Sequence, residues 1–490
     1  MQRTPKRALL IVAALLFVAP VSAIAGGPEI ADQGARATGR GGAMTVKADD
    51  PSAIYYNPAG LALQRGTGFL LSNRMLYTDI EFRRARTLDW SDATHGVPRL
   101  VDFEHVRNEV PWTWLSPMAA VTSDFGLEDW TFAVGMYAPN AAGHLKYPRF
   151  GPQRYMMTEQ DVIMLYYNAS VAWKYKDLFG VGLSLQYVDV PRFNFSVVVD
   201  GNISPRHVYP DSSPFDMHVA IRGEDRFGFT GILGAWVKPI RGLEIALAGR
   251  FLPIHIRTDS TLDVTADNLA SDEPVKVLKG SVEDNRVAFE ITFPTQLRGG
   301  IRWYLEEGGR ELADIELDVQ WEMWSQNSRY LLDAGVTTEL AGQRVDIDQV
   351  AIPREFIDTV SIRLGGDVQV IPGRLWLRAG GFYESPAVRP AYAYLDALSF
   401  HRLSPSAGLT LRVLGADLSV AYNWVFQTPA VVTEEEARVY QQVPGSLCQP
   451  PYMDKDVCEE HYLGKPSAPA NAGTYLSTFH AVNASLSFAL

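Results

Sequence analysis

Residues 313–323 alternate between apolar and polar side chains without a break: Ala313-Asp314-Ile315-Glu316-Leu317-Asp318-Val319-Gln320-Trp321-Glu322-Met323. In a helix the apolar residues would be spread around the whole circumference, whereas in a strand they all lie on one face. The opposite face then carries only acidic and amide side chains. Such a strand fits a sheet that packs on a second sheet, or a membrane barrel with lipid outside and a wet lumen inside.

The same period of two recurs along the chain, and the segments that carry it are separated by turn-forming residues. We therefore predict about fourteen strands, at residues 66–82, 110–124, 129–139, 162–176, 179–192, 218–237, 243–258, 284–304, 312–326, 356–370, 374–384, 405–414, 416–427 and 476–490.

The connections between these segments alternate between short and long. Residues 126–128 and 240–242 form short ones, and residues 140–161 and 428–475 form long ones. Short turns on one side and long loops on the other are typical of outer-membrane barrels. The prediction is an all-β, antiparallel transmembrane barrel over residues 66–490.

The last predicted strand resembles the assembly signal of outer-membrane barrels, although Leu490 stands where Phe is usual and Phe488 lies two residues before it. The expected surroundings are therefore the bacterial outer membrane, its lipid and lipopolysaccharide, and the barrel assembly machinery.

The N-terminus predicts export. Arg3, Lys6 and Arg7 precede an apolar run over residues 8–19, and the small residues of 21–25 follow. This is the pattern of a signal peptide, predicted here at residues 1–25. An uncleaved anchor fits less well, because the apolar core is short and Pro20 falls near its end. The net charge of −12 argues against nucleic acid as a partner, since phosphate contacts need clustered Lys and Arg.

The two cysteines, Cys448 and Cys458, lie in a loop-like stretch. In an oxidising compartment we expect them to form a disulfide that closes a short loop. A metal site or a nucleophile is the alternative, but the chain has no second cysteine pair and His461 stands alone nearby. No metal is predicted.

Residues 26–65 lack sustained alternation and are rich in Gly and Ala. Asp50 is expected to cap a short helix with Pro51 at its first position, and Asn57-Pro58 to form a turn. A phosphate loop is set aside, because no Lys-Ser/Thr follows the glycines. A barrel of this size is too wide for wall side chains to fill, so we predict that residues 26–65 plug it.

Three parts of the chain resemble the FadL family, outer-membrane transporters of long-chain fatty acids and other hydrophobic compounds. The first is similar to the family's plug and ends in Asn57-Pro58-Ala59-Gly60-Leu61; the others lie at residues 293–325 and 363–386. The resemblance implies a monomeric barrel without a cofactor, with residues 26–65 as a hatch and Asn57, Pro58, Ala59 and Gly60 as its motif.

The resemblance also implies a route for the ligand. A hydrophobic molecule is captured at the outer loops, passes to an internal pocket and leaves sideways through the wall at the third strand, residues 129–139. Gly135 and Pro139 lie on that strand, and both residue types weaken a ladder.

A fatty-acid carboxylate would need a cation in the lumen. Alternation turns six arginines inward, of which Arg250, Arg298 and Arg302 are the predicted contacts; the others are Arg363, Arg378 and Arg412. The alternative for each is an ion pair with an acidic residue on a neighbouring strand.

Other functions stay open at this point. They are a transporter of aromatic hydrocarbons or other lipids, a general porin, and an adhesin that uses the long loops. A barrel enzyme is disfavoured, because neither G-x-S-x-G nor H-E-x-x-H is present.

Overall fold

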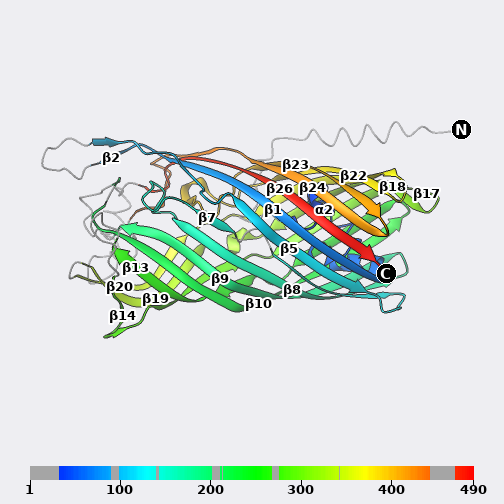
Figure 1. The fold of residues 1–490 in the computed structure, drawn as a ribbon, viewed down its shortest axis with the longest axis horizontal. Helices are drawn as coiled ribbons and strands as arrows, with labels where there is room; N and C mark the ends of the chain where they lie inside the picture. Colours follow the sequence, from blue (N-terminus) through cyan, green and yellow to red (C-terminus); the bar gives the residue numbers. More distant parts are fainter. Residues whose placement is uncertain are drawn as a thin grey trace.

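The computed structural model describes residues 32–89, 99–138, 143–200, 210–211, 213–266, 275–340, 343–441 and 469–490. Within these residues the chain forms a closed 14-strand antiparallel barrel (Figure 1). The strands of its wall, in the order in which they pair, are β1 (Thr67–Arg84), β5 (Trp112–Ser123), β6 (Trp130–Tyr137), β8 (Glu159–Tyr175), β9 (Phe179–Asp200), β10 (Asp216–Ile240), β11 (Leu243–Arg250), β17 (Gln296–Glu307), β18 (Arg310–Glu322), β21 (Thr359–Ile371), β22 (Leu375–Glu384), β23 (Arg402–Val413), β24 (Ala416–Gln427) and β26 (Gly473–Ala489).

The first and last strands close the wall. β1 pairs with β26 along its whole length, from Gly68 opposite Ala489 to Arg84 opposite Gly473. Closure matters because lipid offers no partner for backbone N–H and C=O groups, so a sheet in a membrane must have no free edge. The predicted strand at residues 476–490 therefore completes the barrel.

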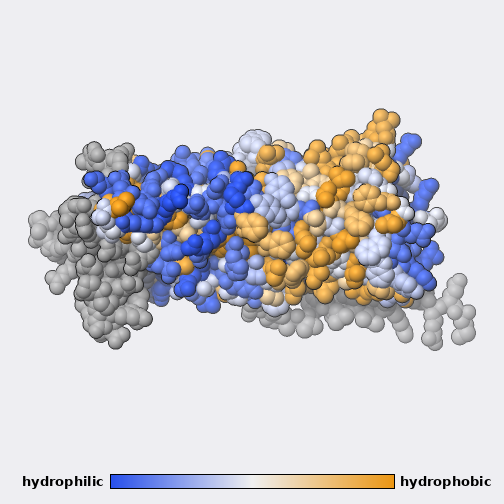
Figure 2. Space-filling view, turned by 90° about the horizontal axis from the view of Figure 1, so that it is seen from below, coloured by the Kyte–Doolittle hydropathy of each residue, from blue (hydrophilic) through white to orange (hydrophobic). Residues whose placement is uncertain are grey.

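The alternation of residues 313–323 is confirmed on β18. Glu316, Asp318 and Gln320 are buried in the lumen, whereas Leu317 and Val319 are exposed on the outer face. On the face that Figure 2 shows, apolar side chains form a belt across one half of the barrel's length, and the other half is hydrophilic. The belt is the surface expected to face lipid.

The wall is much taller than the belt. β10 has 25 residues, which at the usual rise of a strand is roughly 80 Å of chain, against an apolar band of roughly 25 Å in such barrels. Its outer part is extended by further strands, which lie in the long connections: β12 (Ile254–Arg257), β13 (Asp259–Ala266), β14 (Val277–Lys279), β15 (Val282–Glu283), β16 (Arg286–Phe293), β19 (Arg329–Leu340) and β20 (Gln343–Pro353).

These outer strands differ from three sequence predictions. Residues 243–258 are two strands, β11 and β12, and residues 284–304 are also two, β16 and β17. The second break contains Pro294, which has no N–H for a ladder. Residues 327–355, predicted as a loop, form the hairpin of β19 and β20, because loop residues outside the membrane can still pair with one another.

The remaining elements are short. They are β2 (Thr87–Asp89), β3 (Arg99–Val101), β4 (Val106–Arg107), β7 (His144–Lys146), β25 (Ala430–Val432), and the 3-10 turns η2 (Trp324–Gln326) and η3 (Pro390–Tyr392). Three helical elements occupy the lumen: α2 (Ala35–Gly39), α3 (Ala53–Tyr56) and η1 (Pro58–Leu63). Among the described residues, no helix has the length and apolar character needed to cross a membrane.

A charge on the lipid-facing side tests the orientation of β18. Replacing Leu317, midway along the strand, with Arg is expected to lower the free energy of unfolding by about 2–4 kcal/mol, the cost of a charge near the bilayer midplane. Urea unfolding of the protein in liposomes measures this. Leu414→Arg is the matched control: Leu414 is fully exposed in the turn before β24, so its replacement should change little. Equal effects of the two variants would contradict the assignment of the belt.

Candidate functional site in the barrel lumen

Residues 32–65, here called the lumenal segment, lie inside the wall. The Asn57-Pro58-Ala59-Gly60 motif is fully buried there. The Asn57 Oδ1 accepts a hydrogen bond from the Ala59 N–H at 3.1 Å, which caps η1, and its Nδ2 donates to the Thr45 carbonyl at 2.9 Å. Trp236 Nε1 on β10 donates to the Ala59 carbonyl at 2.8 Å. The motif therefore shapes a turn and fastens it to the wall.

The expected cap by Asp50 has a different form. α3 begins at Ala53 after Ser52, so Pro51 is not its first residue. Asp50 Oδ1 accepts a hydrogen bond from the Ser52 N–H at 2.8 Å and shapes the turn that leads into the helix, rather than capping the helix itself.

Wall glycines mark the places where the lumenal segment lies directly on the barrel. A Cβ at Gly408 would lie 3.1 Å from the Gly39 Cα, and one at Gly380 would lie 2.8 Å from the Gly41 nitrogen. A side chain at Gly182 would collide with the backbone of Pro58 and Ala59. Gly365 and Gly380 thus supply room for the backbone of Arg40.

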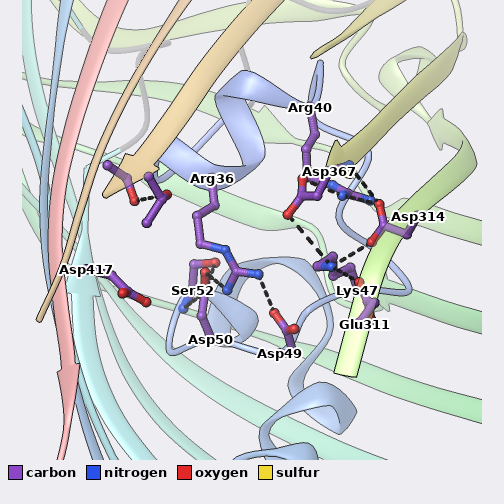
Figure 3. Close-up of polar contacts among 12 residues, drawn as sticks. Arg36, Arg40, Lys47, Asp49, Asp50, Ser52, Glu311, Asp314, Asp367 and Asp417 are labelled. Carbon is purple, nitrogen blue, oxygen red and sulfur yellow. Dashed lines mark hydrogen bonds and ion pairs between the residues drawn. The ribbon is translucent and has the colours of Figure 1, made fainter. Parts of the chain in front are cut away.

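Buried ion pairs hold the segment to β18 and β21 (Figure 3). The Arg40 guanidinium contacts the carboxylates of Asp314 at 2.7 Å, Glu316 at 3.0 Å and Asp367 at 2.7 Å. The Lys47 ammonium lies 2.6 Å from Asp314 and also contacts Glu311.

The acidic face of β18 also binds the backbone of the segment. Asp318 Oδ2 accepts hydrogen bonds from the N–H groups of Met44 and Thr45 at 3.0 and 2.9 Å, and Glu316 Oε1 accepts one from Val46 at 2.7 Å. The polar half of the alternation is therefore the docking surface of the lumenal segment. Removing one partner of such a buried pair leaves an uncompensated charge, which is strongly destabilising.

A small cavity of about 10 Å³, here called the inner cavity, lies beside this segment. Two of the predicted contacts, Arg250 and Arg298, line it. No carboxylate is among the described residues that line this cavity. Arg298 donates to the Tyr55 carbonyl at 3.3 Å and lies over the Tyr55 ring at 4.6 Å. The full lining is Tyr55, Tyr56, Tyr137, Ile232, Gly249, Arg250, Gln296 and Arg298.

Arg302, Arg363, Arg378 and Arg412 form ion pairs with carboxylates. Arg302 contacts Glu244 at 2.6 Å and Asp314 at 2.8 Å, so it belongs to the charged network below the inner cavity and does not line that cavity. Arg363, Arg378 and Arg412 pair with Asp32, Asp367 and Asp417. These four arginines therefore form the ion pairs that were the alternative to substrate binding. Arg250 and Arg298 both line the inner cavity.

A second cavity of about 60 Å³, here called the outer chamber, lies farther toward the outer ends of the strands than the first, between the tall strands and the outer hairpins. Its walls are mainly aromatic and aliphatic, with a few polar groups among them. The lining residues are Gln160, Val162, Met164, Val190, Phe193, Phe195, Ile256, Phe289, Ile291, Phe293, Trp324, Asn327, Tyr330, Asp396 and Ala397.

One ion pair borders the outer chamber. Arg354 donates two hydrogen bonds of 2.8 Å to Asp396. Its Cζ lies 4.1 Å from the centroid of the Tyr330 ring and 3.9 Å from that of the Tyr394 ring. Burial opposes the charge on Arg354, but the Asp396 carboxylate outweighs it and holds the pKa of Arg354 above its ordinary value. Burial also raises the pKa of Tyr394 to about 12, so its hydroxyl stays neutral.

The wall changes at the upper end of β6. The ladder between β6 and β8 ends at Tyr137 opposite Tyr166, and the one between β7 and β8 begins at His144 opposite Asp161. Gly135 faces the lumen, where a Cβ would lie 2.7 Å from Ile54 Cδ1 of the lumenal segment. Pro139 lies outside the described residues, as do Cys448, Cys458 and the predicted signal peptide.

Sequence reasoning missed the outer chamber. Phe193 and Phe195 were assigned to a loop, although the period of two continues through them on β9, and this continuation was the available signal. Trp324, Tyr330 and Asp396 come from segments whose contact depends on tertiary structure, and no local pattern marks them.

The comparisons with known proteins agree with this architecture. A sequence profile of the family described as outer membrane protein transport protein (OMPP1/FadL/TodX) matches residues 16–448. The chain therefore belongs to this family of bacterial outer-membrane transport proteins, which are channels for hydrophobic molecules and not enzymes. A search of curated proteins finds no match.

Solved structures show the same fold at low identity. A Pseudomonas aeruginosa FadL homologue superposes with a TM-score of 0.69 at 14% identity, covering 95% of this chain and 100% of that one. The Pseudomonas putida toluene transporter TodX gives 0.58 at 14%, covering 94% and 98%. The Ralstonia pickettii toluene transporter TbuX gives 0.56 at 14%, covering 94% and 99%.

Two neighbouring glycines of β17 test the docking of the lumenal segment. A Cβ at Gly300 points inward and would lie 2.8 Å from Val46 Cγ2, whereas one at Gly299 points outward and has 3.6 Å to its nearest neighbour, Leu247 Cδ1. Gly300→Val should displace residues 44–47 and make cells more permeable to a small polar dye, with Gly299→Val as the matched control. A sealed Gly300→Val barrel with an undisturbed segment would contradict the docking.

Arg36 lies in α2, and Arg40 directly follows that helix. Variants of the two residues distinguish contacts with the wall from contacts within the lumenal segment. Arg40 pairs with wall carboxylates, whereas Arg36 pairs with Asp49 and Asp50 inside the segment. Arg40→Met should weaken docking by about 3–5 kcal/mol, because buried Glu316 loses the cation that contacts it and Asp314 and Asp367 each lose one of theirs. Hydrogen exchange of the segment's amides should rise sharply in Arg40→Met and little in Arg36→Met. Similar exchange in both variants would show that the wall pairs do not hold the segment.

Proposed function

We propose that this protein takes up long-chain fatty acids passively across the outer membrane, with residues 26–65 as the hatch of the barrel. The observation that carries the choice of substrate is the inner cavity, where Arg250 and Arg298 converge and no carboxylate lines the space. The guanidinium groups of Arg250 and Arg298 supply N–H donors to an anionic head group, because charge-assisted hydrogen bonds to a carboxylate are among the strongest.

The apolar half of the substrate has a matching environment. Each buried methylene contributes about 0.8 kcal/mol to binding, and the outer chamber offers an aromatic and aliphatic lining. An acyl chain that extends from the inner cavity toward this chamber would be removed from water at both of its ends. The net movement needs no energy source, provided that release on the inner side is downhill.

The hatch and the wall supply the proposed exit. The centroid of the Tyr55 ring lies 5.0 Å from that of Tyr137, edge to face, and the stacked rings of Tyr137 and Tyr166 have centroids 4.9 Å apart. This aromatic chain joins the inner cavity to the upper end of β6, where the β6–β8 ladder stops. A shift of the segment around Ile54 and Tyr55 would loosen the packing on Gly135 and open a sideways route into the membrane.

A second candidate is the uptake of aromatic hydrocarbons. The outer chamber favours it, because rings of Phe193, Phe289 and Phe293 surround the space and aromatic pairs prefer such contacts. Charge separates the candidates, since a hydrocarbon has no acceptor for a charge-assisted hydrogen bond from Arg250 or Arg298.

The inner arginines provide the test. The double variant Arg250→Gln, Arg298→Gln should reduce oleate uptake by cells about tenfold to a hundredfold, the loss expected for hydrogen bonds to a charged group, and leave toluene uptake unchanged. Labelled substrate in cells that express each variant gives both rates.

Arg412→Gln is the control, because Arg412 is an exposed arginine whose partner is Asp417, away from both cavities. Unchanged oleate uptake in the double variant would contradict the fatty-acid assignment. Large steady conductance of the wild-type protein in planar bilayers would contradict the transporter and favour a porin.

A further inference from the structure

Asn327 carries a buried amide side chain that has no hydrogen-bond partner within the part of the chain that the structure describes. The residue follows η2 and is 2% exposed, and its backbone N–H donates to the Trp324 carbonyl at 2.8 Å. Neither its Oδ1 nor its Nδ2 has a hydrogen-bond partner among the described residues. Buried amides are almost always hydrogen-bonded, because leaving one unpaired is costly. The orphaned amide therefore calls for an explanation.

The side chain of Asn327 lines the outer chamber. Its neighbours in the lining include the rings of Phe289, Phe293 and Trp324. Such a wall gives a bound molecule apolar contact over most of its surface and two amides, of which Asn327 is the fully buried one and can both donate and accept. This is the layout of a small-molecule site: a mainly apolar cleft with a few placed polar groups.

The charges beside the chamber cancel. Asp396 is the lining carboxylate, and both of its oxygens accept hydrogen bonds from Arg354. The Arg354 guanidinium is enclosed between two tyrosine rings, so it is not offered as a free cation. In contrast to the inner cavity with its two arginines, the outer chamber thus presents a neutral hydrogen-bonding group.

The size of the chamber adds a condition. Its volume of about 60 Å³ is well below the roughly 150 Å³ of an engineered apolar cavity that takes up benzene. Water could enter this volume, but a water molecule needs two to four polar partners, and the lining around Asn327 is mostly apolar. A ring enters only when side chains such as Met164, which is flexible, move aside.

We propose that Asn327 is a specificity-determining residue of the outer chamber, which selects apolar molecules that carry one uncharged hydroxyl group over pure hydrocarbons. The hydroxyl donates to Oδ1 or accepts from Nδ2 of Asn327, while the rest of the molecule lies against the aromatic wall. This goes beyond the proposed function, because it concerns the binding of neutral molecules at a cavity that the two arginines do not line.

Matched ligands test the proposal on the purified full-length protein in detergent. Isothermal titration calorimetry with 4-ethylphenol, 4-ethylanisole and ethylbenzene gives the preference for a hydroxyl over an ether and over hydrogen. Asn327→Leu should lower the preference for 4-ethylphenol over ethylbenzene by about threefold to tenfold, the effect of one neutral hydrogen bond. Binding of ethylbenzene should be unchanged or tighter.

Asn423 supplies the matched control. It is also fully buried, and both of its side-chain polar atoms lack partners among the described residues, but it lies on β24 and lines neither cavity. Asn423→Leu removes the same groups and should leave the preference as in the wild type. Each ligand partitions into detergent to the same extent with every variant. This partitioning therefore cancels when the ratio of the affinities for 4-ethylphenol and ethylbenzene is compared between variants.

Three outcomes overturn the proposal. One is an unchanged preference in Asn327→Leu, which would mean that the amide holds a structural water only. Another is an equal loss in Asn423→Leu. The third is a wild-type protein that binds 4-ethylphenol no better than 4-ethylanisole, a result that needs no variant and so remains informative if Asn327→Leu fails to fold. Failure of the proposed function is distinct: it would abolish the effect of the inner arginines on uptake and leave this preference intact.

Discussion

The backbone must be fully hydrogen-bonded inside the membrane, and most other features of the protein follow from that constraint. A closed ladder from β1 to β26 removes every edge within the wall, and it obliges each strand to show one face to lipid and one to the lumen. The lumenal face of β18 is consequently free to be acidic. That acidity is balanced by Arg40 and Lys47 of the lumenal segment, so the wall and the segment inside it are electrostatically dependent on each other.

The lumen is divided by chemistry along its length. The charged network around Asp314 holds the segment, the inner cavity above it carries Arg250 and Arg298, and the outer chamber is aromatic and neutral. A molecule that enters from outside would meet apolar surface first, cations second and the docked segment last. This order suits an amphipathic substrate, because its apolar part can be desolvated before its head group is bound.

The sequence predicted the wall more accurately than the outer region. All fourteen predicted wall strands correspond to strands of the barrel, because the period of two is enforced by lipid on one side. Outside the membrane that enforcement ends: the pattern predicts a loop where β19 and β20 form a hairpin, and one strand where the structure has β16 and β17. The Asn57 motif was recognised by resemblance, but its bonds to Thr45 and Trp236 join residues far apart in the chain.

By itself, the sequence determined the barrel, its closure by the last strand and the inward direction of the arginines, since alternation is a local property that a membrane converts directly into orientation. Only the tertiary structure decided which inward arginines join the charged network around Asp314 and Asp367 and which line the inner cavity. It alone also brought Asn327 and Asp396 to one chamber. The physical reason is that charge pairing and burial depend on partners from other strands, and alternation specifies a face without specifying what lies across the lumen from it.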